Sequence, residues 1–228
     1  MENKLIDLTN IKGAIFDVDG TMLDSMKLWQ DVEANYLRSL GKEPNPDFID
    51  VMRVYSHDEA ADYFRDAYGI AKTNREITDE KNKLMEEGYA VLCTIKSGVI
   101  KTLETLKENN IRMCVATATD KYLVEIGLKR FGIDKYFEKI FTCGEENTTK
   151  GRPDIFLNAA KFLGTIPTQT LVFEDALHAI ESAKSAGFVV VAVSDLAQED
   201  NLEVIRTAGD YYFDSMGDIF HTSLSASK

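Results

Sequence analysis

The sequence contains few cysteine and histidine residues, and those present are scattered. Its three cysteines form no Cys-x-x-Cys pair, and its three histidines show no zinc-ligand spacing. The pattern therefore excludes a disulfide-stapled scaffold and gives no sign of a zinc site. An odd number of cysteines and the lack of a signal-peptide pattern lead us to expect a reduced, cytoplasmic protein.

The sequence also lacks basic stretches and long apolar runs. Its 26 basic and 38 acidic residues give a formal net charge of −12. We therefore expect neither nucleic acid nor a membrane as a partner. The chain has 228 residues, of which 44% are hydrophobic, enough for one large domain or two smaller ones with a proper core. We expect a monomer or a weak dimer.

The most informative stretch is an apolar run that ends in two carboxylates. Residues 14–16 are typical of a short buried strand, and Asp17 and Asp19 follow, with Gly20 as a turn signal. Like charges this close need a cation, and Mg²⁺ prefers such oxygen ligands. A solvated turn is the ordinary alternative. A calcium loop is excluded, because Gly20 stands at its fourth position and Leu28 at its twelfth.

Periodicity divides the chain into two regimes. Residues 26–92 show helical spacing only, whereas strands and helices alternate from residue 99 onward. Such alternation predicts an α/β fold with a doubly wound parallel sheet. We expect residues 1–24 and 96–228 to form this α/β core, and residues 25–95 to form an inserted all-helical cap domain. The expected strands after the insert are 111–117, 139–142, 170–175, 188–193 and 211–213; the expected helices are 47–55, 56–68, 78–92, 99–109, 120–131, 153–163 and 176–186, with another ending before residue 41.

Polar side chains follow four of these strands or lie in the loop after them. Besides the first pair of carboxylates they are Thr117, Lys150, Glu174 and Asp175. In a parallel sheet all of these positions point to one edge. Carboxylates, a hydroxyl, an ammonium and loop amides together can bind a metal and a phosphoryl group. Taken singly, Thr117 or Glu174-Asp175 also fits a helix cap and Lys150 a solvated loop, but their ordered recurrence favours a site.

Four segments of the chain resemble the motifs of the haloacid dehalogenase superfamily. They are Phe-Asp-Val-Asp-Gly-Thr at 16–21, Thr117, Lys-Gly-Arg-Pro-Asp at 150–154 and Phe-Glu-Asp at 173–175. The spacing and the helical insert are similar to the β-phosphoglucomutase and phosphoglycolate phosphatase-like branch, which has a helical cap. The resemblance covers nearly the whole chain and implies a Rossmann-like core with an aspartyl-phosphate mechanism.

The resemblance also implies which carboxylates do which chemistry. Asp17 would be the nucleophile, and Asp19 the general acid and base. The carboxylate of Asp17, the main-chain carbonyl of Asp19 and the carboxylate of Asp175 would hold Mg²⁺, with Glu174 as a further ligand or a neighbouring support.

The same resemblance assigns the phosphate-binding groups. Thr117 and Lys150 would bind phosphate oxygens and take part in catalysis, helped by loop amides near Gly20 and Ala118. The helical insert would close over the site through linkers at 24–27 and 92–98 and contact the leaving group. Candidate contacts in the insert are Trp29, Arg53, Tyr55, His57, Lys81 and Lys83.

Three functions follow from these residues. We expect a Mg²⁺-dependent phosphatase acting on a small phosphorylated metabolite, such as a sugar phosphate. A phosphomutase is the alternative, although Trp29 stands where ungapped counting places the histidine of that branch. The third is a non-catalytic phosphometabolite-binding protein, but binding alone does not require Asp19. The resemblance also implies that Asp19 argues against dehalogenation, because in that superfamily this second carboxylate separates phosphate chemistry from dehalogenation.

Overall fold

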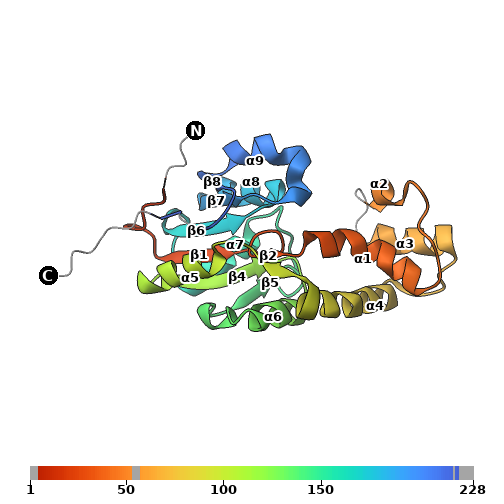
Figure 1. Ribbon diagram of the computed structural model, residues 1–228. Coiled ribbons are helices and arrows are strands. Elements are labelled where there is room, and N and C mark those ends of the chain that lie inside the picture. The colour runs from red at the N-terminus through yellow and green to blue at the C-terminus, as the bar shows by residue number, and fades with distance from the viewer. Residues whose placement is uncertain (1–4, 53–56, 218, 221–228) are drawn as a thin grey trace. The chain divides into compact units, whose positions relative to one another are not determined.

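The computed structural model describes the backbone of residues 5–52, 57–217 and 219–220, without the side chains of residues 49, 50 and 57–59 (Figure 1). The chain divides into two compact units: Met1–Asp24 with Thr94–Lys228, and Ser25–Cys93. Among the described helices, none is both long and apolar enough to cross a membrane.

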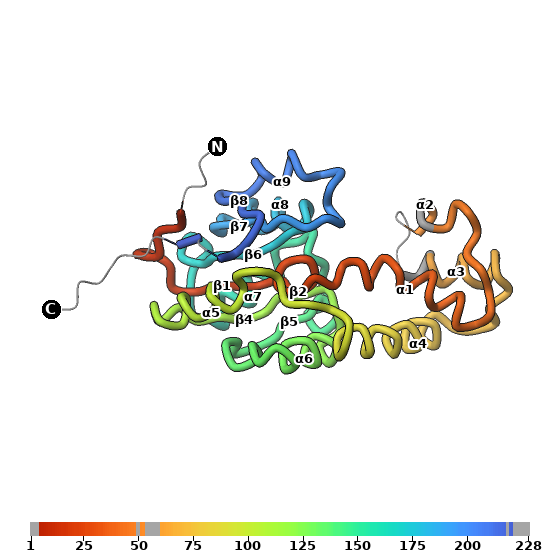
Figure 2. Tube along the Cα trace, in the orientation of Figure 1, coloured from red at the N-terminus to blue at the C-terminus, as the bar shows by residue number. Residues whose placement is uncertain are grey.

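The first unit contains a six-stranded parallel sheet, which confirms the predicted fold class. The strand order is β5-β4-β1-β6-β7-β8, so the first strand of the chain lies inside the sheet between strands of much later sequence (Figure 2). The strands are near-continuous apolar runs, as expected for a sheet with both faces covered. Their bounds are β1 Gly13–Phe16, β4 Arg112–Thr117, β5 Ile140–Thr142, β6 Thr170–Glu174, β7 Val189–Val193 and β8 Tyr211–Phe213.

Helices follow the strands in the alternation that the sequence predicts. Residues of β1, β4, β6 and β7 pack with α7 and α8 in one buried cluster. The alternate side chains of the same strands form a second apolar layer, in which Phe16 stacks on Phe173 with ring centroids 4.2 Å apart. The helices are α5 Val99–Glu108, α6 Lys121–Arg130, α7 Asp154–Leu163, α8 Leu177–Ser185 and α9 Leu202–Ala208, with short 3₁₀ turns at Asp134–Tyr136, Pro167–Gln169 and Leu196–Asn201.

The register of β1 aligns the ends of the central strands. Phe16 pairs with Val115 of β4 and with Phe173 of β6, and the N–H of Asp17 donates to the Phe173 carbonyl at 3.0 Å. The next strands along the chain, β4 and β5, lie on one side of β1, whereas β6 and β7 lie on the other. The strand order therefore reverses at β1, which is where open α/β sheets bind ligands at their carboxyl ends.

A small antiparallel ladder joins the two places where the chain passes between the units. It pairs β2 Leu23–Asp24 with β3 Thr94–Ile95. The sequence did not predict this ladder or helix α9, because two-residue strands and a seven-residue helix are too short to show a period.

The described residues of the second unit form helices joined by turns and contain no strand, as the periodicity predicts. Its core gathers Tyr36, Leu37, Phe48, Phe64 and Ile77, of which Tyr36 and Phe64 meet edge to face at 5.5 Å. The elements are α1 Met26–Ser39, α2 Phe48–Met52, α3 His57–Tyr68, α4 Asn74–Glu87 and a π-helical turn at Gly88–Leu92.

The predicted start of α4 at residue 78 is wrong by four residues. The helix begins at Asn74 because Thr73 and Glu76 form a capping box. The N–H of Glu76 donates to the Thr73 hydroxyl at 3.3 Å, and the N–H of Thr73 donates to the Glu76 carboxylate at 2.8 Å. The motif is visible in the sequence, but the apolar period begins only at Ile77.

Gly98, immediately before α5, should be among the most sensitive positions of the first unit. Its φ is +84°, and a Cβ there would overlap the main chain of Met216 and Gly217. Gly132 shares a positive φ of +64°, but no atom lies within 4 Å of its Cβ position. We expect Gly98→Ala to lower the free energy of unfolding by about 3 kcal/mol or more and Gly132→Ala by about 1 kcal/mol, measured by urea unfolding. Equal losses would contradict the packing argument.

Candidate active site

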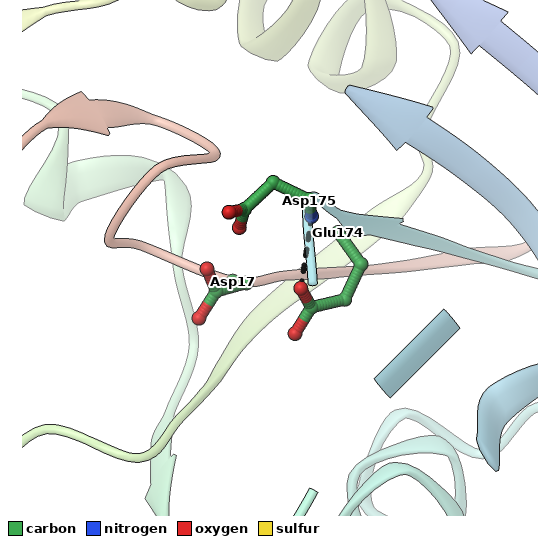
Figure 3. A group of neighbouring side chains, drawn as sticks. All are labelled: Asp17, Glu174 and Asp175. Atoms are coloured by element: carbon green, nitrogen blue, oxygen red, sulfur yellow. Dashed lines mark hydrogen bonds between the residues drawn. The ribbon is translucent and has the colours of Figure 1, made fainter. Parts of the chain in front are cut away.

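Three carboxylates meet at the carboxyl ends of β1 and β6. Asp17 follows β1, Glu174 ends β6 and Asp175 follows it. Figure 3 shows the three side chains together at these strand ends. Each offers an oxygen within 4.8 Å of the other two, and all three residues are buried. Two of the four strand-end positions predicted from the sequence therefore come together as one acidic group.

Lys150 places a positive charge in this acidic group. Its Nζ contacts Oδ1 of Asp17 and Oε1 of Glu174, and its side chain is 7% exposed. The interpretation of Lys150 as a solvated loop lysine is therefore wrong. Two of the three buried carboxylates are therefore paired with the one ammonium.

Glu174 is not the helix N-cap that the sequence allowed, because the N-cap of α8 is Ala176, which has no side-chain capping hydrogen bond. Oε2 of Glu174 accepts the N–H groups of Asp175 and Ala176, at 2.9 and 3.0 Å, at the start of α8, while its Oε1 meets Lys150. An acidic side chain suits a helix N-terminus. Glu174 thus holds both the segment that leads into α8 and the ammonium of Lys150.

Asp175 lies against the turn that follows Asp19. Its Oδ1 accepts the Thr21 hydroxyl at 3.0 Å. Gly20 has a φ of +84°, and a Cβ at this residue would lie 2.5 Å from Oδ2 of Asp175. Only glycine permits so close an approach at that backbone conformation.

Asp19 is positioned by a residue that was not among the predicted site residues. Oδ2 of Asp19 accepts the Thr119 hydroxyl at 2.7 Å, and Asp19 itself is half-buried. Thr119 follows β4 by two residues, and its N–H donates to the hydroxyl of buried Thr117 at 3.1 Å. Thr117 therefore shapes this loop. It is not the helix cap that the sequence also allowed, because the N-cap of α6 is Asp120. Ala118, between the two threonines, is exposed. The repeated threonine after a strand was the available sequence signal.

The charges of the site shift its pKa values strongly. Burial raises the pKa of Asp17 to about 7, although Lys150 opposes the shift. Burial and the charges of Glu174 and Asp17 also raise the pKa of Asp175. Burial alone would lower the pKa of Lys150, but Asp17 and Glu174 raise it overall. The group thus holds more carboxylate than its single ammonium neutralises.

This donor set fits a hard divalent cation. Such ions prefer carboxylate oxygens, and an added positive charge would remove the carboxylate repulsion that the pKa shifts reflect. Asp17 and Asp175 are the better placed of the three carboxylates, because both oxygens of Glu174 already have partners. The acidic group can therefore bind a metal ion such as Mg²⁺.

Two of the residues predicted to contact the leaving group have hydrogen-bond partners within the helical unit itself. Trp29 is half-buried and donates through Nε1 to the Tyr89 hydroxyl at 3.1 Å. Lys81 is buried and donates to Glu33 at 2.7 Å, whereas Lys83 is exposed. Arg53, Tyr55 and the side chain of His57 lie outside the described residues.

Comparison with known proteins gives one consistent family. The family model described as "Haloacid dehalogenase-like hydrolase" matches residues 14–193. A phosphorylated carbohydrates phosphatase of Thermotoga maritima is 26% identical over 181 residues, covering 78% of this chain and 82% of that protein. The fructose-1-phosphate phosphatase YqaB of Escherichia coli is 29% identical over 189 residues, covering 79% and 95%.

The solved structures show the same fold. The crystal structure of a putative β-phosphoglucomutase from Thermotoga maritima matches with a TM-score of 0.76, covering 92% of this chain and 96% of that one. At 23% sequence identity this likeness concerns the fold alone.

The raised pKa of Asp17 predicts how the stability of the metal-free protein depends on pH. Its ordinary value is 3.8 and its folded value about 7, so the folded state holds this proton more tightly. The free energy of unfolding should therefore fall as pH rises from 3.8 through about 7. We expect about 1 kcal/mol of this fall between pH of about 6 and 8. Thermal melting in EDTA measures it, with Asp17→Asn, which cannot ionise, as the control with a smaller dependence. Higher stability at the more alkaline pH would contradict the charge analysis.

Proposed function

Because the chain belongs to the haloacid dehalogenase-like hydrolase family, we propose that it is a Mg²⁺-dependent phosphatase acting on a small phosphomonoester such as a sugar phosphate. The observation that carries the proposal is the convergence of Asp17, Lys150 and Asp175 at one sheet edge, with Asp19 two residues beyond Asp17. The names of the phosphatase relatives support the substrate class.

Asp17 would act as the nucleophile. Lys150 holds Oδ1 of Asp17 and so fixes the orientation of the carboxylate. An oxygen of Asp17 attacks phosphorus, the bond from phosphorus to the leaving oxygen breaks, and an aspartyl-phosphate forms. The positive charge of Lys150 reduces the repulsion between the anionic carboxylate and the anionic phosphoryl group.

Asp19 would move the protons of both half-reactions. It protonates the leaving oxygen in the first step, then accepts a proton from the water that attacks phosphorus and releases Asp17. The hydrogen bond from Thr119 to Oδ2 limits how Asp19 can turn. A protein that only bound phosphometabolites would not need this second carboxylate.

The remaining residues of the site would bind metal and phosphate. The carboxylates of Asp17 and Asp175 and the main-chain carbonyl of Asp19 would hold Mg²⁺, which would help neutralise the phosphoryl oxygens. Thr117 and the amides near Gly20 and Ala118 would bind those oxygens. We propose the helical unit as the cap that selects the leaving group.

Phosphate release from a panel of sugar phosphates, phosphoglycolate and nucleotides tests the proposal. With Mg²⁺ present, we expect release that EDTA abolishes and that Asp17→Asn lowers by at least about 10³-fold, since the nucleophile is lost. Asp66→Asn, which alters an exposed aspartate of the helical unit, is the matched control and should retain activity.

Two results would contradict the proposed phosphatase. Full activity of Asp17→Asn would exclude this nucleophile. A folded, Mg²⁺-loaded protein that releases no phosphate but isomerises a hexose 1-phosphate would be a phosphomutase instead.

A further inference from the structure

A half-buried lysine lies beside the turn that carries Asp19. Lys96 follows β3, and its side chain is 17% exposed. Its Nζ donates to the carbonyl of Gly20 at 2.5 Å, to the carbonyl of Ser194 at 2.6 Å and to Oδ2 of Asp195 at 2.9 Å. An ammonium has three donors, and here each has its own acceptor. Neither sequence motifs nor the proposed chemistry assigns a role to this residue.

The same residue holds the turn at a second point. The main-chain N–H of Lys96 donates to the carbonyl of Met22 at 2.9 Å. Within the turn, Gly20 donates to the Leu23 carbonyl, and Met22 and Leu23 both donate to the Val18 carbonyl, all at 2.8 to 2.9 Å. The turn is therefore closed by its own hydrogen bonds and held through two carbonyls by one external residue.

The turn held in this way contacts the acidic group. Thr21 donates to Oδ1 of Asp175 at 3.0 Å, and Gly20 approaches Oδ2 of the same carboxylate. The Gly20–Thr21 segment thus has contacts to Lys96 and to Asp175. Moving the Gly20 carbonyl would move the Asp175 contact and the adjacent Asp19 together.

We propose that Lys96 is a positioning residue that fixes the turn 18–23 through the Gly20 carbonyl and thereby places Asp19 and Asp175 for metal binding and turnover. The ion pair with Asp195 holds the ammonium in place, since Asp195 is itself fixed by the N–H of Ala197 at 2.9 Å. The effect on turnover rests on the proposed function and the effect on Mg²⁺ affinity on the proposed metal site, whereas the effect on the turn rests on neither.

Lys96→Met tests the proposal, because methionine keeps much of the apolar stem and removes the donors. We expect Mg²⁺ affinity, measured by calorimetric titration, and kcat each to fall about 10-fold or more, as is usual when a group supporting metal ligands is lost. KM for the substrate should change by less than about 3-fold, because Lys96 does not touch the substrate in this account. Hydrogen exchange of the amides of Gly20, Met22 and Leu23 should be faster.

Two further variants separate this role from general effects of charge. Asp195→Asn keeps both main-chain acceptors of Lys96, so its losses should stay below about 3-fold. Lys161→Met removes an exposed lysine of α7 and should match the wild type. If Lys96→Met does not fold, Lys96→Gln, which retains an amide donor, should show an intermediate loss.

Several outcomes would overturn the proposal. One is a folded Lys96→Met or Lys96→Gln protein with wild-type Mg²⁺ affinity and amide exchange; another is an equal loss in Asp195→Asn, which would assign the effect to charge. A wild type that binds Mg²⁺ but releases no phosphate would refute the proposed function, while the binding and exchange data still decide the role of Lys96. A wild type that binds no Mg²⁺ would overturn both.

Discussion

The candidate active site is defined by a surplus of acidic groups that the sheet buries at one edge. Asp17, Glu174 and Asp175 lie within 4.8 Å of one another, and Lys150 supplies one positive charge among them. Burial of unbalanced charge is unfavourable unless a partner is bound. These carboxylates can bind a metal ion, and the ammonium can pair with an anionic phosphoryl group. The repulsion among the buried carboxylates thus destabilises the metal-free protein, and the same repulsion favours the binding of a cation.

The fold determines which residues share that edge. Because β1 lies between β4 and β6, the chain after β1 is adjacent to loops more than 90 residues further along the sequence, and Thr119 and Asp19 are hydrogen bonded across 100 positions. Parallel register then sets the ends of the strands at similar heights. The chemistry of the site follows from short polar segments at strand ends, while the strands themselves supply the apolar framework.

The sequence predicted the strands and the carboxylates of the site because both have a local signature. An apolar run followed by Asp17, or by Asp175, is visible without a structure. Thr119 was noted beside Thr117 but given no role, and Lys96 was not recognised, because both roles arise from contacts with residues far away in the sequence. The burial of Lys150 was likewise beyond reach, since a lysine in a loop of polar residues is ordinarily solvated. Pattern therefore predicts which groups carry the chemistry, whereas the residues that position them require the three-dimensional contacts.

The most direct test of the account is to find the phosphoryl group on the protein. The protein, with Mg²⁺ and its best substrate, is quenched in acid during turnover, and its peptides are analysed by mass spectrometry; Asp19→Asn, which should hydrolyse the intermediate slowly, is treated in parallel. We expect a phosphoryl group on Asp17 that is enriched in Asp19→Asn and absent from Asp17→Asn. Phosphate release with the phosphoryl group on another residue would contradict the assignment of Asp17 as the nucleophile. Phosphate release with no phosphoryl group on the wild type or on Asp19→Asn would contradict it as well.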